Sequence, residues 1–399
     1  MKNINKKISY GKNVYDKREI NAVIKTLKKS TQMGDAVNQF ESKIAKLFNK
    51  KLGLMVNSGS SALILALKIM NFKKDSEVIT PCLNFGTAIS SILLNGLKPV
   101  FVDCEIETLQ VDVNQIEKKI IKNTKALLIP NLIGNIPDWK KIRKIANKYN
   151  LIVIEDSADT LGATIDKKST GNYSDLSITS FYGSHIISCG GNGGMLLLNN
   201  KKLYDKAKVL RSWGRMSTLI KDSEDIDKRL GIKLKGFEYD RKFVFSEIGY
   251  NFEPSEMGAS FGLVQLKKFK YFNKQRNNNF KLHYNFFKMY DKFFILPKIE
   301  KNIKTNFLAY PIILKKKIAF SRKSFQTYLE KKNIQTRPIF SGNILRHPAF
   351  NNLVSKQNNI NSFKKSDYIM SNGLLIGCHQ GLNLKDMSYI HKKILEFIN

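Results

Sequence analysis

The chain has 399 residues, of which 42% are hydrophobic and 25% are charged, as in a globular protein with a large buried core. It carries 67 Lys and Arg against 33 Asp and Glu, a formal net charge of +34. The basic residues are spread along the whole chain and are not interleaved with aromatics, so we do not expect nucleic-acid binding. No apolar run reaches the ~18 residues of a membrane-spanning helix, and the amino terminus lacks a signal peptide's apolar core. These features favour a cytoplasmic protein without membrane insertion.

The four cysteines are far apart in the chain and form no CxxC pair. They are Cys82, Cys104, Cys189 and Cys378. In a cytoplasmic chain this spacing predicts reduced thiols, and neither a disulfide framework nor a metal or iron–sulfur site.

The first half of the chain alternates helices with short apolar strands. Apolar residues at helical spacing predict two helices near the amino terminus, followed by strand–turn–helix units. The expected segments are helices at 16–30 and 36–49, strand–helix units at 52–70 and 76–96, strands at 98–105, 124–134 and 151–156, and a helix at 138–149. This alternation predicts an α/β protein with a mainly parallel central sheet.

After about residue 255 the pattern changes to a smaller α+β region. A long helical stretch over 256–293 leads into it. Beyond this stretch we expect a strand at 306–314, a helix at 321–332, a strand at 333–340 and a closing amphipathic helix at 384–399. The sequence therefore predicts a large domain, residues 1–270, and a small C-terminal domain, residues 271–399.

The turn in "NSGSSALILAL" is a candidate phosphate seat. A strand that enters a helix through a Ser/Gly turn presents free backbone N–H groups at the positive end of the helix dipole. Gly59 allows close approach of the backbone, and Ser60 adds a hydroxyl. Many strand-to-helix turns share this pattern without binding an anion, so the turn alone does not decide the matter.

Two further loops follow predicted strands. In "ITPCLNFGTAIS", Phe85 can stack on a planar ring at the edge of the sheet, or it can be an ordinary core residue. In "IEDSAD", carboxylates end a buried strand, a position that requires a partner. Asp156 can hold a protonated pyridine nitrogen and Asp159 the oxygen of the same ring. A salt bridge or a helix cap is the structural alternative.

In this order, the loops resemble the DegT/DnrJ/EryC1/StrS family of nucleotide-sugar enzymes. The motifs that carry the resemblance are "SGSSAL", "VITPCLNFGTA", "PVFVDCE", "LIGN", "IEDSAD", "SFYGSH", "GNGGM" and "GYNFEPSEMGASFGLVQL". The resemblance implies a fold-type-I transferase dependent on pyridoxal 5'-phosphate. It also implies a homodimer with shared active sites.

Transferred motif by motif, the resemblance assigns roles to individual residues. Gly59, Ser60 and Ser180 would contact the cofactor phosphate. Phe85 would stack on the cofactor ring, and Asp156 would pair with its nitrogen. The remaining residue, Asn251, would reach the phosphate of the neighbouring subunit.

One position departs from the usual family pattern. Family sequences read S-F-x-x-x-K, where the lysine binds the cofactor covalently, but here Ser180-Phe181 is followed at the same spacing by His185. Imidazole forms no stable imine with an aldehyde, yet it serves as an acid or base near neutral pH. This substitution favours the amine form, pyridoxamine phosphate, and elimination of a hydroxyl group over amino transfer.

His185 and Asp159 together resemble a subgroup of the family, the nucleotide-sugar 3-dehydratases. These enzymes remove the C3 hydroxyl of 4-keto-6-deoxysugars on the way to 3,6-dideoxysugars of surface polysaccharides. The CDP-sugar type holds an iron–sulfur cluster through cysteines after a W-G-R motif, but this chain has no cysteine between Trp213 and Tyr250. The resemblance therefore implies the GDP-4-keto-6-deoxymannose 3-dehydratase type, with L-glutamate as amino donor.

Two alternatives remain open at this stage. A sugar aminotransferase of the same family, or a relative that binds nucleotide sugars without catalysis, would use a similar framework. Arg215 and Arg337 are candidate substrate or diphosphate contacts, because guanidinium matches phosphate geometry. Either arginine could equally form a surface or interdomain salt bridge.

Overall fold

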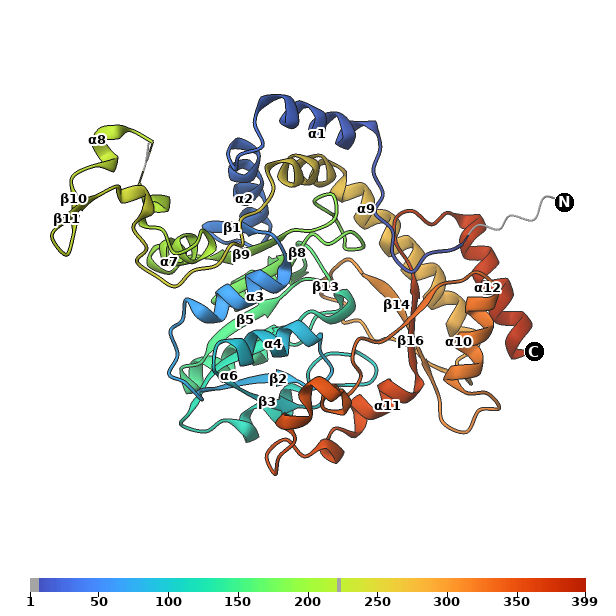
Figure 1. Cartoon of the computed structure of the whole chain (residues 1–399). Helices are drawn as coiled ribbons and strands as arrows, with labels where there is room; N and C mark the ends of the chain where they lie inside the picture. Colours follow the sequence, from blue (N-terminus) through green and yellow to red (C-terminus); the bar gives the residue numbers. More distant parts are fainter. Residues whose placement is uncertain (1–6, 221–223) are drawn as a thin grey trace.

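The computed structural model describes residues 7–220 and 224–399, and its largest element is a seven-stranded sheet (Figure 1). The strand order is β1-β9-β8-β5-β4-β2-β3. These strands are β1 (Leu52–Val56), β2 (Glu77–Pro81), β3 (Lys98–Val102), β4 (Thr124–Pro130), β5 (Ile152–Asp156), β8 (Leu176–Ser180) and β9 (Gly194–Leu198). Within this sheet β9 runs antiparallel to both of its neighbours, and the other pairs are parallel.

Helices cover both faces of this sheet, because successive side chains of each strand point to opposite sides. The helices of this region are α1 (Lys17–Lys29), α2 (Asp35–Leu47), α3 (Gly59–Lys68), α4 (Gly86–Leu94), α5 (Val113–Ile116), α6 (Trp139–Tyr149) and α7 (Lys201–Arg211). One apolar core joins the sheet to α3, α4 and α7, and a second joins the opposite face to α6. This layering confirms the predicted α/β fold.

The carboxyl-terminal region has a sheet of its own. Its antiparallel strands have the order β12-β14-β16-β15 and are packed against α10 and α12 over an aromatic-rich core. The elements are β12 (Phe294–Ile295), β14 (Ala309–Leu314), α10 (Arg322–Lys331), β15 (Thr336–Pro338), α11 (Lys364–Asn372), β16 (Gly373–Gly377) and α12 (Leu384–Ile398). The predicted helices at 321–332 and 384–399 are confirmed to within a residue or two.

The two regions are joined by α9 (Glu256–Lys288), a helix of 33 residues. It packs against α1 and α2 at one end and reaches α12 at the other (Figure 1). The predicted boundary near residue 270 falls inside this helix, and the division into 1–270 and 271–399 stays a prediction. The small pieces β6 (Thr164–Ile165), β7 (Lys168–Ser169) and β13 (Ile303–Lys304) form a further sheet across the boundary.

The amino-terminal residues 8–14, here called the strap, return to the small sheet. Ile8 pairs with Ile334, and the backbone N–H of Tyr10 donates to Oε1 of Gln335 at 2.9 Å. On the other side Asn13 Nδ2 donates to Oγ of Ser188 at 3.1 Å. The strap therefore ties the small domain to the loop that contains His185.

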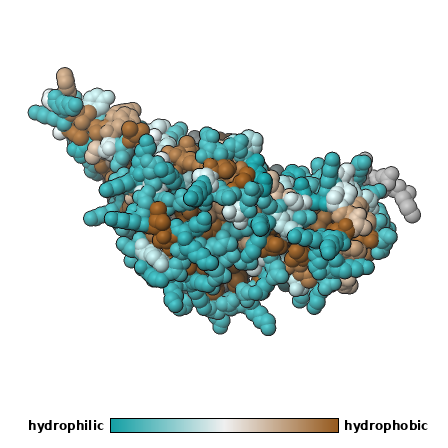
Figure 2. Space-filling model, turned by 90° about the horizontal axis from the view of Figure 1, so that it is seen from below, coloured by the Kyte–Doolittle hydropathy of each residue, from teal (hydrophilic) through white to brown (hydrophobic). Residues whose placement is uncertain are grey.

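A projecting arm, residues 213–220 and 224–248, leaves the body after α7 (Figure 1). It contains α8 (Ile226–Arg229), β10 (Ile232–Leu234) and β11 (Phe237–Tyr239). Figure 2 shows hydrophobic surface along it, and its large apolar side chains are exposed, up to 91% for Ile248. Within the described residues every helix is too short or too polar to cross a bilayer.

Candidate active site

A cavity of about 350 Å³ opens at the carboxyl ends of the parallel strands. It is lined by residues from the loops after β1, β2, β4, β5 and β8, and by Leu308 and Phe340 of the small domain. The residues that the sequence singled out and that meet here are Gly59, Ser60, Phe85, Asp156, Asp159, Ser180 and His185. Parallel strands bring these loops together because their carboxyl ends share one edge of the sheet.

The first turn of α3 forms one wall of the cavity. Ser58 caps the helix by accepting from the N–H of Ser61, and the first intrahelical bond runs from Ala62 N to Ser58 O. The amides of Gly59 and Ser60 precede that bond and lie at the positive end of the helix dipole. A Cβ on residue 59 would lie 2.8 Å from Cβ of Ser180, so only glycine allows β8 to approach this closely. The arrangement is suited to an anion.

Two buried carboxyl groups face the cavity from the end of β5. Asp156 Oδ1 accepts from the N–H of Ala158 at 3.0 Å, and Asp159 Oδ2 accepts from the N–H of Ile133 at 2.8 Å. Burial raises the pKa of Asp156 to about 6 and the pKa of Asp159 to about 7. Both groups therefore have unused capacity for a cationic or hydrogen-bonding partner.

His185 stands on the loop after β8 and lines the same cavity as these carboxyls. Its ring packs edge-on to Tyr182, with 5.8 Å between ring centroids, and Nδ1 is buried without a hydrogen-bond partner among the described residues. Burial lowers the pKa of His185 to about 4, and hydrogen bonding to the backbone of Ser180 opposes this effect. The imidazole is therefore neutral at pH 7 and able to accept a proton.

Phe85 lies at the mouth of the cavity and not in the core. It is 55% exposed and meets Phe340 of the small domain edge to face, at 6.0 Å between centroids. Beyond it the cleft widens, and Arg337 and His347 line this outer part. Arg337 is exposed and lies over the ring of Tyr10, 5.9 Å from its centroid.

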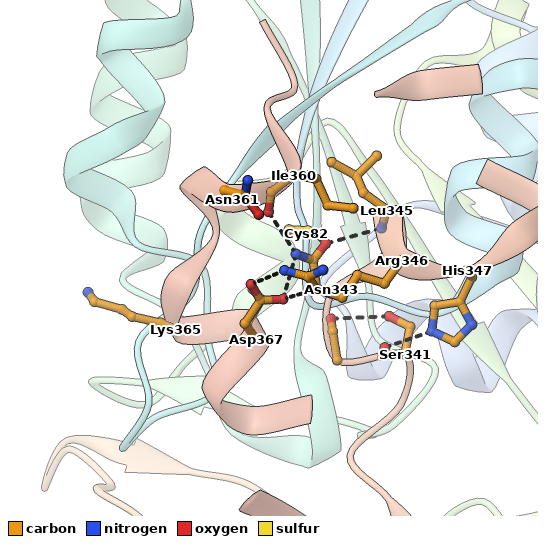
Figure 3. Close-up of polar contacts among 12 residues, drawn as sticks. Cys82, Ser341, Asn343, Leu345, Arg346, His347, Ile360, Asn361, Lys365 and Asp367 are labelled. Carbon is orange, nitrogen blue, oxygen red and sulfur yellow. Dashed lines mark hydrogen bonds and ion pairs between the residues drawn. The ribbon is translucent and has the colours of Figure 1, made fainter. Parts of the chain in front are cut away.

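The loop that holds Ser341 and His347 is fixed by a polar cluster beside it (Figure 3). The buried Cys82 thiol donates to Asn343 Oδ1, and Asn343 Nδ2 donates to Asp367 at 2.8 Å. Arg346 holds the same carboxylate with two bonds, of 2.5 and 2.6 Å. Beside the cluster, Ser341 Oγ donates to the carbonyl of Asn84, next to Phe85, at 2.7 Å. The outer wall of the cleft is thereby tied to the loop after β2.

Two expected contact residues lie elsewhere. Asn251 is exposed where the arm returns to the body, and it is not among the described residues that line the cavity. Arg215 lies in the arm, stacked over Trp213 at 4.0 Å, and its Nε is buried without a partner. Within a single chain neither side chain reaches the cavity.

Several lining residues were not found from the sequence. Tyr10 reaches the cavity on the strap, and burial is the main cause that raises its pKa. Tyr182 and Ser184 precede the predicted histidine on the same loop, and Thr87 accepts from Ser60 Oγ at 3.1 Å. These three residues lie within the motifs that carry the family resemblance, which could have indicated them, whereas nothing local indicated Tyr10. Among the described residues that line the cavity and the outer cleft, none is a lysine.

Comparison with known proteins identifies relatives over nearly the whole length. The profile of the DegT/DnrJ/EryC1/StrS aminotransferase family matches residues 13–395. The chain is 32% identical to the lipopolysaccharide biosynthesis protein RfbH of Salmonella typhimurium, over 90% of this chain and 84% of that protein. It is 30% identical to the GDP-4-keto-6-deoxy-D-mannose 3-dehydratase of Escherichia coli O55:H7, over 95% of this chain and 97% of that protein.

A solved structure agrees with the sequence relatives. The E. coli GDP-4-keto-6-deoxy-D-mannose-3-dehydratase with bound hydrated PLP superposes with a TM-score of 0.86 at 28% identity, covering 97% of this chain and all of that one. The fold predicted for the whole chain is thus found in a solved structure.

Proposed function

This chain belongs to the DegT/DnrJ/EryC1/StrS aminotransferase family, and on that premise we propose that it is a 3-dehydratase of nucleotide-linked 4-keto-6-deoxysugars. The observation that carries the proposal is a neutral, half-buried imidazole at residue 185, in a cavity whose described lining contains no lysine. A side chain that moves protons but forms no stable imine suits elimination of a hydroxyl group better than tethered amino transfer.

The cavity fits pyridoxal phosphate and its amine form, the cofactor of this family. The unpaired amides at the start of α3, with Ser60 and Ser180, offer a seat for the phosphate. Asp156, which among the described residues has one backbone donor and no cationic partner, would hold the ring nitrogen. Asp159 would face the ring oxygen, and Phe85 would stack on the ring.

When bound, the amine form supplies an amino group that condenses with the 4-keto carbon and a ring that takes up electrons. His185 would act as the base that accepts the departing proton of the cofactor's methylene group. The imidazole has the capacity to do so, because it is neutral and its Nδ1 is unpaired. Once protonated, the same ring can give its proton to the hydroxyl that leaves C3. Tyr182, packed edge-on, limits the orientation of the imidazole.

The sugar nucleotide would lie in the outer cleft, between the loop after β2 and the loop fixed by Asn343. Arg337 is the candidate contact for the diphosphate there, since it lines the cleft and bonds no carboxylate among the described residues. We favour a GDP-linked sugar because the relatives named as 3-dehydratases include GDP-sugar enzymes. L-glutamate would regenerate the amine form, and the product would enter a surface polysaccharide.

The active form would be a homodimer. Most of the large apolar side chains described in the arm are exposed, and burying such surface drives association. Asn251 lies at the base of this arm, away from its own cavity, and would contribute to the phosphate seat of the partner subunit. Arg215, which also lies where the arm joins the body, would approach the partner's substrate.

Product analysis tests the proposal. The purified chain is mixed with pyridoxamine phosphate, L-glutamate and GDP-4-keto-6-deoxymannose, and nucleotide sugars and ammonia are quantified. We expect a 3-deoxy ketosugar and catalytic release of ammonia. A stoichiometric, stable aminosugar would instead establish an aminotransferase, and absence of turnover with GDP-, CDP-, UDP- and dTDP-linked sugars would establish a binding protein.

The matched pair His185→Asn and His185→Lys isolates the role of the imidazole. His185→Asn should bind pyridoxamine phosphate but lose turnover by about 10²–10⁴-fold, the usual contribution of a general base. His185→Lys should gain a borohydride-reducible bond to pyridoxal phosphate, which the native chain should lack. Unchanged dehydration by His185→Asn would refute the assignment of His185.

The dimer has its own test. Ile248→Asp, in the exposed arm, should shift the mass measured by light scattering from dimer toward monomer and lower turnover in parallel. Adding excess Asn251→Ala protein to His185→Asn protein should restore part of the activity, because a mixed dimer then contains one intact site. A monomeric native protein with full activity would contradict the shared site.

A further inference from the structure

The centre of α9 carries a guanidinium that is sealed from solvent. Arg276 has no exposed surface, and all of its hydrogen bonds end on neutral acceptors. These acceptors are Oε1 of Gln380 at 2.7 Å, the carbonyls of Phe307 and Leu308 at 2.9 and 3.1 Å, and the carbonyl of His185 at 3.2 Å.

A buried charge without an opposite charge is costly, and proteins retain one mainly where it has a task. Among the described residues no carboxylate bonds this guanidinium, and burial lowers the pKa of Arg276 only to about 10, so it stays protonated at neutral pH. Its bonds join three segments that are distant in sequence: the His185 loop, the entry to β14 and the segment after β16. The charge thus lies directly behind the proposed base.

We propose that Arg276 is a positioning residue of the active site, which anchors the backbone of His185 and whose unneutralised charge keeps a proton off the imidazole until the reaction supplies one. The inference rests on the proposed function in one respect, the role of His185 as a base. The effect of the Arg276 charge on the protonation of His185 does not depend on that role.

The surroundings of His185 support this role. Burial is the largest cause that lowers its pKa, and the positive charge of Arg276 lowers the pKa further. Among the described residues, the other ionisable side chains that line the cavity with His185 are Tyr182 on its own loop, Asp156 and Asp159 at the end of β5, and Tyr10 on the strap. Both carboxyls have raised pKa values, so they are largely protonated below pH 6 and then offer His185 no anion.

The direct test is an NMR titration of the imidazoles in cofactor-free protein labelled at its five histidines. The signal of His185 is assigned by its absence from His185→Asn. In the native chain we expect its midpoint near pH 4. Arg276→Gln should raise the midpoint by about one unit, the lower end of the effect of a nearby charge, while Arg276→Lys should leave it in place.

Gln380→Glu is a second variant that does not require removal of the arginine. It changes one atom, keeps the acceptor at 2.7 Å and gives the guanidinium a carboxylate, so we expect a folded protein. Neutralising the charge should again raise the midpoint of His185. An unmoved midpoint in both Arg276→Gln and Gln380→Glu, or in Gln380→Glu alone if the former does not fold, would overturn the electrostatic role.

Activity then separates the two roles. The acidic limb of the turnover–pH profile should move to higher pH in Gln380→Glu, by the shift that NMR records, with the plateau retained. Arg276→Lys should keep the limb and lower the plateau, because it cannot hold the same set of carbonyls. If the NMR shift occurs while no sugar is dehydrated by any form, the proposed function fails and the electrostatic part of the inference about Arg276 stands.

Discussion

Ionisable groups are buried both at the floor of the cavity and in the interior of the small domain, but they are satisfied differently. Asp156 and Asp159 each accept one backbone N–H and face open space. In the small domain His283 has both ring nitrogens engaged, by His391 at 3.0 Å and by the carbonyl of Gly377 at 3.1 Å. His391 in turn stacks on Phe286, at 4.2 Å between centroids. Burial perturbs the pKa in both regions, so spare bonding capacity, and not the shift, distinguishes a site from a core.

The strongest test of this distinction is Asp156→Asn. The variant should lose turnover by about 10²–10³-fold, because the charge opposite the cofactor ring is removed. In the cofactor-free protein the free energy of unfolding at pH 8 should not fall, since an amide avoids the cost of a buried ionised carboxyl. Steady-state kinetics and urea denaturation measure the two effects.

Glu155→Gln is the matched control, because Glu155 precedes Asp156 on β5 and is fully buried. Its carboxylate accepts from four side chains: Asn131, Ser157, Ser174 and Ser177. We expect this change to lower stability with little effect on turnover per folded molecule. The reverse pattern in the two variants would contradict the proposed distinction.

In the small domain, His283→Leu should lower the free energy of unfolding without lowering turnover. Loss of the imidazole leaves the Gly377 carbonyl and His391 without their partner, at a cost of about 1–3 kcal/mol. Turnover of the folded fraction should be unchanged. A drop in turnover larger than the drop in folded protein would connect this pair to the reaction and remove the contrast.

Phe85→Ala probes the rim of the cavity. Because the ring is largely exposed, its removal should scarcely change stability. Lost stacking should weaken cofactor binding by about 0.5–1.5 kcal/mol, a factor of roughly 2–10. Fluorescence titration with pyridoxamine phosphate measures this loss of affinity. Phe101→Ala, in the core, should instead lower stability and scarcely change cofactor binding.

The pH dependence of the free energy of unfolding should also differ between the two regions, and this is the smallest of the expected effects. Burial lowers the pKa of His283 to about 3 and the pKa of His391 to about 4, so their contribution is complete above pH 6.5 and is lost as pH falls toward those values. Asp156 and Asp159 have raised pKa values, and their contribution is lost as pH rises through about 6 and 7.

The two trends oppose each other in the cofactor-free protein between about pH 4 and pH 7, so its free energy of unfolding should change little with pH there. Removing one side of the balance should expose the other: stability should fall as pH rises in His391→Gln and fall as pH drops in Asp156→Asn, as measured by urea denaturation at pH 5 and pH 8. If His391→Gln had the same pH dependence as the native chain, the histidine pair would not contribute to it.

The floor of the cavity was readable from the sequence, and the reason is topological. Parallel strands bring their carboxyl ends to one edge, so motifs in chain order predicted that Gly59, Asp156 and His185 would meet. The placement of Arg215 in the arm was not foreseen, because the local sequence does not indicate whether a segment projects from the body of the protein. Tyr10 and Arg276 were missed for a related reason, since their partners lie between about thirty and more than three hundred residues away in sequence.

The strap has a consequence for how the protein is made. Its partners include Ile334, Gln335 and His379, which leave the ribosome long after residues 8–14 do. The large sheet can form while synthesis continues, but the wall that Tyr10 provides must wait until nearly the whole chain has been released. A truncated product would therefore display an open, incomplete pocket, and only finished molecules would close it.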